Sequence, residues 1–567
     1  MFHNYLITAL RNFTRHKLYS FINIAGLTVG LACAIFIILF VRDELSYDRW
    51  IPGTENLYRV EVTYFNAGQP PLRTANTTYP AADAMLAQMP EVRAAVHLEN
   101  YQMTVTTGDR QFLDQVNVVS PNFFQIIQLP LVAGNRSSLL TQPESAVISE
   151  RAARKYFASK AAIGQMLKVG GRCLSGRNVS GDCIVREATV MVTGITRDLP
   201  HNTQLSGDVF IPDTSAAYPE APTEKTIWSN SHGYGYVELQ SGADARKVEA
   251  KLPALIDRNF DPRKTMGLTV RGSQDLRLTL TRFRDDHLST DRYGGMTPGG
   301  NWATVYGFIA VGAMILLIAC FNFTNLATAR AMARAREISL RKVVGARRSQ
   351  LVTQFLGESV LMALVSLILA LALVEILLPL YDQMLGKPIQ LHYLAEWPLL
   401  LTLMGMAILA GVLAGFYPAL VLSGFHPALT LRTNANGQSG SGLLRTILVV
   451  MQFAVSIGLG IAALVVFAQI SYARAIDLGL DRDGIVVIYT QGLSEAAREG
   501  LFRALDADPA LKGASLSGNT PFSGSNWNST VEIPGAAGTR MFHTIPVGPN
   551  FFSLYGIHLV SGRALSD

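Results

Sequence analysis

The sequence predicts a polytopic α-helical membrane protein with large extracytoplasmic α+β domains. The first observation is composition, because 49% of the 567 residues are hydrophobic and only 16% are charged. The second is a set of apolar runs, each long enough to cross a bilayer core, which takes about 20 helical residues. The third is a long segment of mixed polarity between the first two runs. The five runs are residues 19–41, 303–327, 351–380, 397–422 and 445–470.

The first run is predicted to be a retained membrane anchor. It is too long for the core of a signal peptide, and VRDELSYDRW follows it in place of a small-residue cleavage site. Residues 1–18 have an apolar helical face, which predicts an amphipathic helix lying in the inner interface of the membrane. A plain positively charged flank is the alternative. The apolar face consists of Tyr5, Leu6, Ala9, Leu10 and Phe13.

Basic residues set the predicted orientation, because short loops rich in Lys and Arg stay in the cytoplasm. Residues 1–18 carry three cations and no acid, and residues 328–350 carry seven cations and one acid. Since the whole chain has a net charge of +6, everything else nets −3. The basic balance therefore marks a cytoplasmic face and not a nucleic-acid partner. The predicted order is a cytoplasmic N-terminus, a large domain outside at 42–302, a cytoplasmic helix or loop at 328–350, a short hairpin outside at 381–396, a cytoplasmic loop at 423–444 and the start of a second outside domain at 471–567.

The 42–302 segment alternates strand-like and helix-like runs, which predicts an α+β domain of two lobes with its own core. The strand-like runs are residues 57–64, 188–195 and 235–239, and the helix-like runs are residues 80–88, 149–158 and 243–259. The domain also holds Cys173 and Cys183 in a Gly- and Ser-rich stretch. An oxidising compartment predicts a disulfide between them, with two unpaired thiols as the alternative. Cys33 and Cys320 lie in spans and are expected to be small apolar residues there.

An internal repeat extends the predicted architecture. VSPNFFQIIQLPLVAG at 119–134 and VGPNFFSLYGIHLVSG at 547–562 share eight of sixteen positions at an offset of 428 residues. The same offset moves the first span onto the fifth, so two independent features have one spacing. Tandem duplication of a unit with one span, a large domain and three spans explains both. We therefore expect eight spans in the full duplicated protein, of which this chain holds five and ends inside its second domain.

Glycines and polar residues inside the spans predict helix contacts. Gly26 and Gly30 form a GxxxG pattern in the first span, and the matching part of the fifth span has Gly458 and Gly460. Close helix approach at these glycines predicts that spans one and five meet. Polar span residues are expected to form hydrogen bonds between helices, or to pair with Arg347 or Arg348, rather than to contact a substrate. These are Asn322, Asn325 and Glu358.

Enzymatic motifs are absent from the sequence. It contains no G-x-x-x-x-G-K-[ST] phosphate loop, no H-E-x-x-H and no G-x-S-x-G, so it is expected neither to hydrolyse ATP nor to bind a catalytic metal. In the basic segment, Glu337 lies four residues before Arg341 and can pair with it on a helix. Gly345 is the natural break before the third span.

Several long motifs resemble the FtsX/MacB-like ABC transporter permeases, of the duplicated eight-span type. NFTNLATARAMARAREISLRKVVGARRSQLVTQFLGESVL at 322–361 is similar to their signature segment. So is YSFINIAGLTVGLACAIFIILFVRDELSYDRW, which NLYRV follows. SPNFF, AVISERAARKYF, AIGQ and RDDHLST are similar to their periplasmic core domain. These motifs occur in the family's order and cover most of the chain.

The resemblance implies a permease subunit of the bacterial inner membrane that works with a separate cytoplasmic ATPase dimer. The ATPase would bind ATP and Mg²⁺, while this chain would bind no cofactor. The resemblance implies mechanotransmission for export or extraction of an amphiphilic, peptide, antibiotic or lipid-linked substrate, with a periplasmic adaptor as a further partner. The alternative is an FtsX-like mechanotransmitter that regulates a periplasmic cell-wall hydrolase. The implied ATPase-coupling residues are Arg336, Glu337, Arg341, Lys342, Gly345, Arg347 and Arg348.

Overall fold

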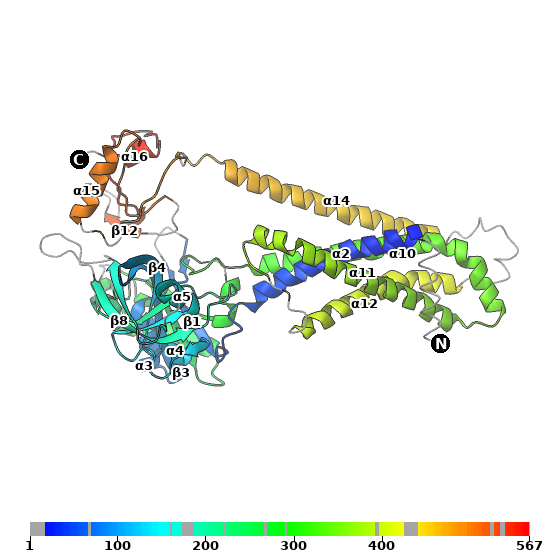
Figure 1. The fold of residues 1–567 in the computed structure, drawn as a ribbon, viewed down its shortest axis with the longest axis horizontal. Coiled ribbons are helices and arrows are strands. Elements are labelled where there is room, and N and C mark those ends of the chain that lie inside the picture. Colours follow the sequence, from blue (N-terminus) through cyan, green and yellow to red (C-terminus); the bar gives the residue numbers. More distant parts are fainter. Residues whose placement is uncertain are drawn as a thin grey trace. The chain divides into compact units, whose positions relative to one another are not determined.

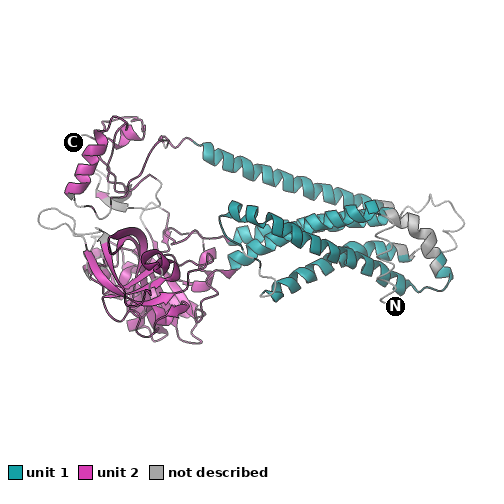
Figure 2. Cartoon of the chain, viewed as in Figure 1, with its two compact units in different colours: residues 1–45, 302–476 teal, residues 46–301, 477–567 magenta. Residues whose placement is uncertain are grey.

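The computed structural model divides into two compact units, residues 1–45 with 302–476 and residues 46–301 with 477–567 (Figure 2). It describes residues 17–65, 70–158, 161–172, 186–218, 222–265, 269–289, 292–389, 391, 396–424, 440–481, 483–490, 493, 495–521, 527–532 and 539–565. The predicted amphipathic helix, except for its last two residues, and both Cys173 and Cys183 lie outside these ranges, as does most of the loop at 423–444.

Within its described residues, the first unit contains five helices that are long and apolar enough to cross a membrane, which is the number of spans predicted from the sequence (Figure 1). They are α2 (Lys17–Ser46), α10 (Trp302–Val343), α11 (Arg348–Leu385), α12 (Trp397–Gly424) and α14 (Gly440–Ala475). Helix α10 continues without a break from the second span through most of the basic segment. Gly345 separates it from α11 with φ +102°, a left-handed conformation that favours glycine.

Four of these helices share a buried core, because their apolar side chains interdigitate along most of the bundle. In one cluster, Leu31 and Ile35 of α2 pack with apolar residues of α11 and α12. In a second cluster, Leu27 of α2 packs with Phe323 of α10 and Met362 of α11. Helix α14 contacts α10, where Asn325 Nδ2 donates to Gln452 Oε1 at 3.4 Å. The most apolar stretch of α14 is otherwise exposed in the described part of this chain.

The second unit is built around one mixed sheet, here called the sheet domain (residues 46–301). Its principal path runs β11-β1-β10-β3-β4-β9-β6-β8-β5, with β2 paired to β1 and β7 paired to β3 and β8. The strands are β1 (Leu57–Tyr64), β2 (Leu72–Thr74), β3 (Val92–Thr107), β4 (Arg110–Val119), β5 (Leu131–Ala133), β6 (Ser145–Ser149), β7 (Met166–Arg172), β8 (Arg186–Thr196), β9 (Val209–Pro212), β10 (Tyr234–Leu239) and β11 (Leu276–Arg282). The pairs β4–β9 and β6–β8 are parallel, and every other pair is antiparallel.

Short helices cover the sheet and divide one side of it into two lobes. The first lobe packs α3 (Tyr79–Gln88) and α7 (Leu252–Asn259) on β1, β10 and β11. The second packs α5 (Glu150–Phe157) over β4, β6, β7, β8 and β9. A third core, which includes Phe123, Phe124 and Phe210, lies on the opposite side of β3. The remaining short elements are α4 (Phe123–Ile126), η1 (Pro222–Thr226), α6 (Ala245–Glu249), α8 (Pro262–Thr265), α9 (Gly272–Asp275) and η2 (Phe283–Leu288).

The C-terminal part contains α15 (Glu495–Asp506), β12 (Trp527–Glu532), β13 (Thr539–Thr544) and α16 (Phe551–Leu554). The sequence repeat forms the same element twice, because α4 and α16 are four-residue helices that each follow an asparagine N-cap, Asn122 or Asn550. The duplication itself stays a prediction. The helix expected at 243–259 is instead two helices, α6 and α7, because Pro253 at the start of α7 begins a new helical segment.

Candidate functional site

A buried charge cluster in the sheet domain begins on β1. Side chains alternate between the two faces of a strand. Tyr58, Val60 and Val62 therefore enter the core of the first lobe, while Arg59 and Glu61 point to the other face. Both charged side chains are completely buried. Charges in such a place need partners, because an isolated buried ion is costly.

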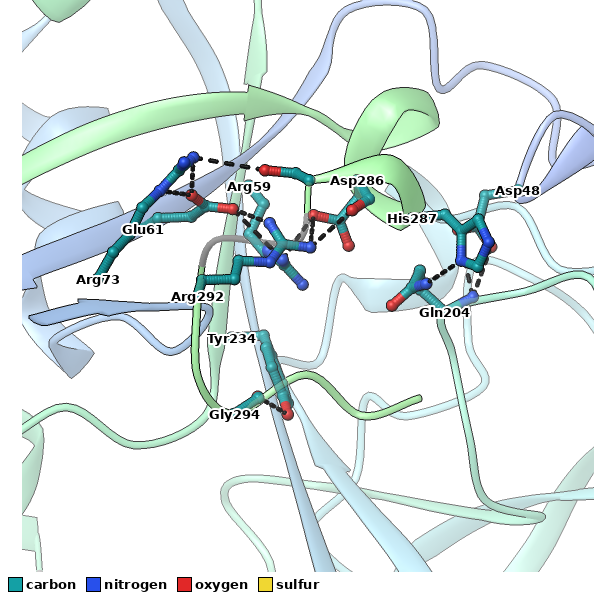
Figure 3. Close-up of polar contacts among 11 residues, drawn as sticks. Asp48, Arg59, Glu61, Arg73, Gln204, Tyr234, Asp286, His287, Arg292 and Gly294 are labelled. Atoms are coloured by element: carbon teal, nitrogen blue, oxygen red, sulfur yellow. Dashed lines mark hydrogen bonds and ion pairs between the residues drawn. The ribbon is translucent and has the colours of Figure 1, made fainter. Parts of the chain in front are cut away.

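The partners come from β2 and from the segment that leads to the second span (Figure 3). Arg59 Nη2 lies 2.6 Å from Asp286 Oδ1 and 3.3 Å from Glu61 Oε1. Arg292 forms ion pairs with Glu61 and, at 2.8 Å, with Asp286, while Arg73 Nη2 lies 2.7 Å from Glu61 Oε2. We call these five residues the junction cluster.

The segment that follows the first span joins the same region. Tyr47 stacks on His287, the neighbour of Asp286, with ring centroids 3.4 Å apart. Asp48 Oδ1 accepts hydrogen bonds from Thr203 Oγ1 at 2.5 Å and from the backbone N–H of Gln204 at 3.1 Å. Gln204 Nε2 and His287 Nδ1 are 2.9 Å apart and complete the connection (Figure 3).

Burial and charge act differently on the carboxyl groups of this region. Burial raises the pKa of Asp48 to about 7, against the hydrogen bonds from Thr203 and Gln204. Burial also raises the pKa of Asp286, although Arg59 and Arg292 oppose it. For Glu61, burial is outweighed by the charges of Arg292, Arg59 and Arg73, so its pKa falls below the ordinary value. The cluster thus keeps Glu61 ionised in a setting where Asp48 titrates near neutral pH.

This arrangement is suited to holding chain segments together rather than to chemistry. Asp48 follows the first span by two residues, and Asp286 and Arg292 precede the start of α10 at Trp302. The motifs DELSYDRW, NLYRV and RDDHLST are therefore brought together by residues Asp48, Arg59 and Asp286. Among the described residues, no group of three His, Cys, Asp or Glu side chains could hold a metal ion.

In the membrane unit, ion pairs connect the C-terminal end of the first span to the turn between the third and fourth. Lys387 Nζ lies 2.7 Å from Glu44 Oε1 and 3.4 Å from Asp43 Oδ2, and both carboxylates are mostly buried. Arg42 and Glu396 form a more exposed pair at 2.5 Å. These contacts fix α2 to the hairpin between α11 and α12.

At the opposite end of the bundle, two predicted coupling residues bind α12. Lys342 Nζ donates to the carbonyl oxygen of Ser423 at 2.7 Å, and Arg348 Nε donates to its Oγ at 3.2 Å. Arg347 begins α11 through a hydrogen bond from its backbone N–H to Gln350 Oε1 at 3.0 Å. The side chains of Arg336, Glu337 and Arg341 lie outside the described part of the chain. The contacts of Lys342 and Arg348 are structural, and the role in ATPase coupling stays a prediction.

The structure changes the expected partner of the span glycines. A Cβ at Gly26 would lie 3.2 Å from Asn322 Nδ2, and one at Gly30 would lie 2.7 Å from Ala319 Cβ. The second span thus packs against these glycines, which corrects the expectation that the fifth does. A Cβ at Gly458 or Gly460 would meet nothing within 4 Å in the described part of this chain.

Two features were missed by the sequence reasoning, and the sequence held a direct signal for only the first of them. Gly411 and Gly415 form a GxxxG pattern in α12, and a Cβ at Gly411 would lie 2.7 Å from Val360 Cα of α11. The strand that carries the junction cluster was signalled by the run YRVEV, in which Arg59 and Glu61 alternate with valines. Such alternation predicts one buried and one solvent-exposed face, so it located the strand but not the burial of its charged face.

Comparison with known proteins gives two domain matches. Residues 20–255 match the MacB-like periplasmic core domain, and residues 309–427 match the FtsX-like permease C-terminal domain. The "Macrolide export ATP-binding/permease protein MacB" of Shewanella sp. (strain W3-18-1) is 22% identical over 421 residues, which are 72% of this chain and 58% of that protein. The "Pyoverdine export ATP-binding/permease protein PvdT" of Pseudomonas putida (strain KT2440) is 22% identical over 410 residues, or 70% of this chain and 55% of that protein. The chain thus spans somewhat more than half the length of these relatives.

A solved domain of a putative permease protein from Porphyromonas gingivalis is also similar, with 22% identity and a TM-score of 0.33 over 42% of this chain and 93% of that one. The spans and the matched domains define the class: a multi-pass membrane protein with periplasmic α+β domains. The chain therefore contains a MacB-like periplasmic core domain and an FtsX-like permease domain, as its motifs indicated.

Proposed function

We propose that the chain is the permease subunit of an ABC exporter whose ATPase is a separate cytoplasmic dimer. The observation that carries this proposal is the order of the two matched domains on a chain with five spans: a MacB-like periplasmic core between the first two, then an FtsX-like module around the basic segment. ATP and Mg²⁺ belong to the partner. The chain would sit in the bacterial inner membrane with its N-terminus in the cytoplasm.

Transport by this protein is proposed to be mechanical. ATPase closure would move the extension of α10, which is continuous with the second span, and Lys342 and Arg348 would carry that motion into α12 through Ser423. The junction cluster would then transmit it to the sheet domain, because its buried ion pairs resist separation. The substrate class proposed is an amphiphile, peptide, antibiotic or lipid-linked molecule. A periplasmic adaptor would complete the path, and two relatives named as exporters of macrolides and of pyoverdine support this class.

The test is ATPase stimulation in a reconstituted complex. The full chain would be placed in lipid nanodiscs with its ATPase subunit, and ATP hydrolysis would be measured with and without a macrolide or pyoverdine. We expect stimulation by a probe of this class, and loss of at least about tenfold of it in an Arg336→Glu, Arg341→Glu variant, since about 1.4 kcal/mol of coupling is a factor of ten. Arg93→Glu is the control, because Arg93 is an exposed residue of the sheet domain.

Two results would contradict the proposal. The first is that neither a macrolide nor pyoverdine stimulates ATP hydrolysis, while the ATP-bound complex activates a periplasmic cell-wall hydrolase. In that case the protein is an FtsX-like regulator. If the Arg336→Glu, Arg341→Glu variant keeps full coupling, the ATPase binds elsewhere.

A further inference from the structure

A second polar cluster interrupts the long strand β3 between the two lobes of the sheet domain. On one face of β3, Ala95 belongs to the core of the first lobe and Tyr101 to the core of the second. Between them the same face carries His97 and Glu99, both buried. With His232, which precedes β10, they form what we call the seam.

Glu99 is the centre of the seam. One carboxylate oxygen, Oε1, lies 2.7 Å from the donating Tyr218 hydroxyl and 3.0 Å from His97 Nε2. The other, Oε2, lies 3.2 Å from His232 Nδ1 and accepts a hydrogen bond from the Tyr101 hydroxyl. Residues of both lobes and of the covering loops therefore converge on one carboxylate.

The seam is closely enclosed by other ionisable groups. Tyr79 of α3 packs its ring 3.9 Å from that of His97 and donates from its hydroxyl to Asp213 at 2.7 Å. Lys225 of η1 pairs with Asp213 at 3.0 Å. The groups that face the seam are Tyr101 on β3, Tyr79 and Asp83 on α3, Asp213 and Tyr218 after β9, and Lys225 on η1.

The charges of this enclosure do not balance while both imidazoles are neutral. Lys225 offsets Asp213, and Asp83 is exposed to solvent. Burial alone would raise the pKa of Glu99, but hydrogen bonds from His232 and His97 outweigh it and keep that pKa well below the ordinary value. Glu99 is thus ionised throughout the physiological range, and one added proton on the histidine pair brings the buried charge to zero. An uncompensated buried charge is costly, so that proton favours the closed seam.

The two histidines are not equivalent receivers of this proton. The side chain of His97 is only 7% exposed and packs against the ring of Tyr79, so it is nearly sealed from water. The side chain of His232 is 23% exposed and already faces Glu99. Gly233 lets this loop lie close against β3, because a Cβ at this position would be 2.4 Å from Glu99 Cγ. Its φ of +70° also favours glycine. His232 is therefore the titrating member.

We propose that the seam is a proton-controlled latch between the two lobes, closed when His232 is protonated and loosened when it is neutral. Histidine changes charge between about pH 5 and 8, a range that a periplasmic domain meets when the medium changes. A proton bound more tightly in the closed state than in the open state makes closure stronger at low pH and weaker as the pH rises. Transport activity is not needed for this inference.

The test is hydrogen exchange in the purified full chain in lipid nanodiscs between pH 5.5 and 8.0. Rates are corrected for the intrinsic pH dependence of exchange, and peptides covering 96–101 and 231–236 report on the seam. Because one proton is linked to opening, we expect corrected protection to fall by up to about tenfold per pH unit within the range where histidine titrates, and to level off above it. His232→Gln and Glu99→Gln are expected to remove this dependence.

His558→Gln is the matched control, since His558 is exposed and lies outside the sheet domain, and it should keep the wild-type pH profile. Corrected protection that is constant from pH 5.5 to 8.0 in the unmodified chain would overturn the proposal without any variant. A His232→Gln chain that folds and keeps the wild-type slope would overturn it as well.

Discussion

Arg59 on β1 and Asp286 on η2 form an ion pair with 2.6 Å between Nη2 and Oδ1, and both side chains are almost completely buried. In the sequence, the two residues come from opposite ends of the sheet domain. One lies in the first strand after the first span, and the other lies in the last helical turn before the second. The ion pair therefore joins the first and last parts of the sheet-domain sequence, and each of these parts lies close in sequence to a membrane-spanning helix.

Removing Asp286 should destabilise the sheet domain strongly. In Asp286→Asn the side chain keeps its shape, but Arg59 and Arg292 retain only Glu61 as a charged partner within the junction cluster. Breaking a buried ion pair by removing one partner costs about 3–5 kcal/mol. Urea unfolding of the full chain, followed by the fluorescence of Trp50 and Trp228, measures this loss.

The control for Asp286→Asn is Glu238→Gln, which breaks the more exposed pair with Arg93. That change should cost no more than about 1 kcal/mol, as exposed pairs do. Equal decreases in the free energy of unfolding in the two variants would show that the buried pair stabilises the domain no more than the exposed pair does.

Asp48 makes the stability of the sheet domain dependent on pH. Its pKa is about 7 in the folded protein, against an ordinary value of 3.8, because the carboxyl is buried. The folded state therefore binds a proton that the unfolded state has already lost between about pH 4 and 7. The stabilisation is complete below this window, declines as the pH rises through it and is absent above pH 7. Asp48→Asn should flatten this decline, because an amide oxygen can still accept from Thr203 and Gln204.

Unfolding midpoints measured from pH 4.5 to 8.0 check this expectation. The difference between the two ends of the range is on the order of 3 kcal/mol, because about 2.5 pH units of the window lie inside it and each is worth about 1.4 kcal/mol. Asp244→Asn is the control, since Asp244 is an exposed N-cap whose function an asparagine also performs. An Asp48→Asn profile as steep as that of the wild type would assign the pH dependence to other groups.

Local elements followed from the sequence much better than long-range contacts did. The run LYRVEVTY predicts a strand at 57–64, and β1 has those bounds because its β-branched residues alternate over a half-apolar surface. The five spans followed from length and hydropathy alone. What periodicity could not supply was the partner of each polar residue. Arg59 meets Asp286 and His232 meets Glu99 only because the order of strands in the sheet brings β1, β3, β10 and β11 together. The same limit explains why Gly30 was assigned to the wrong neighbouring helix.

Lys387 should stabilise the membrane unit through its two carboxylate neighbours. Asp43 and Glu44 are both largely buried at the end of α2, and Lys387 lies within ion-pair distance of each. In Lys387→Met the apolar part of the side chain remains while the charge is lost, and we expect a cost of about 1–3 kcal/mol from the buried carboxylates. Thermal unfolding of the full chain in detergent measures it. Arg42→Met, which breaks the exposed pair with Glu396, should change the midpoint little. A double variant of Lys387 and Glu44 that simply adds the two single effects would argue against a direct interaction.

Gly30 should be required for the contact between the first and second spans. In Gly30→Val the new side chain would collide with Ala319, whose Cβ lies 2.7 Å from the position of the first added carbon, so α2 and α10 must separate. Overpacking of this kind costs about 1–3 kcal/mol, which the thermal unfolding midpoint of the full chain reports. Gly357→Ala is the control, because among the described residues no atom beyond the backbone of α11 itself lies within 4 Å of the added carbon, and alanine favours a helix over glycine. Gly458→Val tests the fifth span in the same way. It should be harmless in this chain, and a loss as large as that of Gly30→Val would show that α14 has a close partner that the contacts described for this chain do not include.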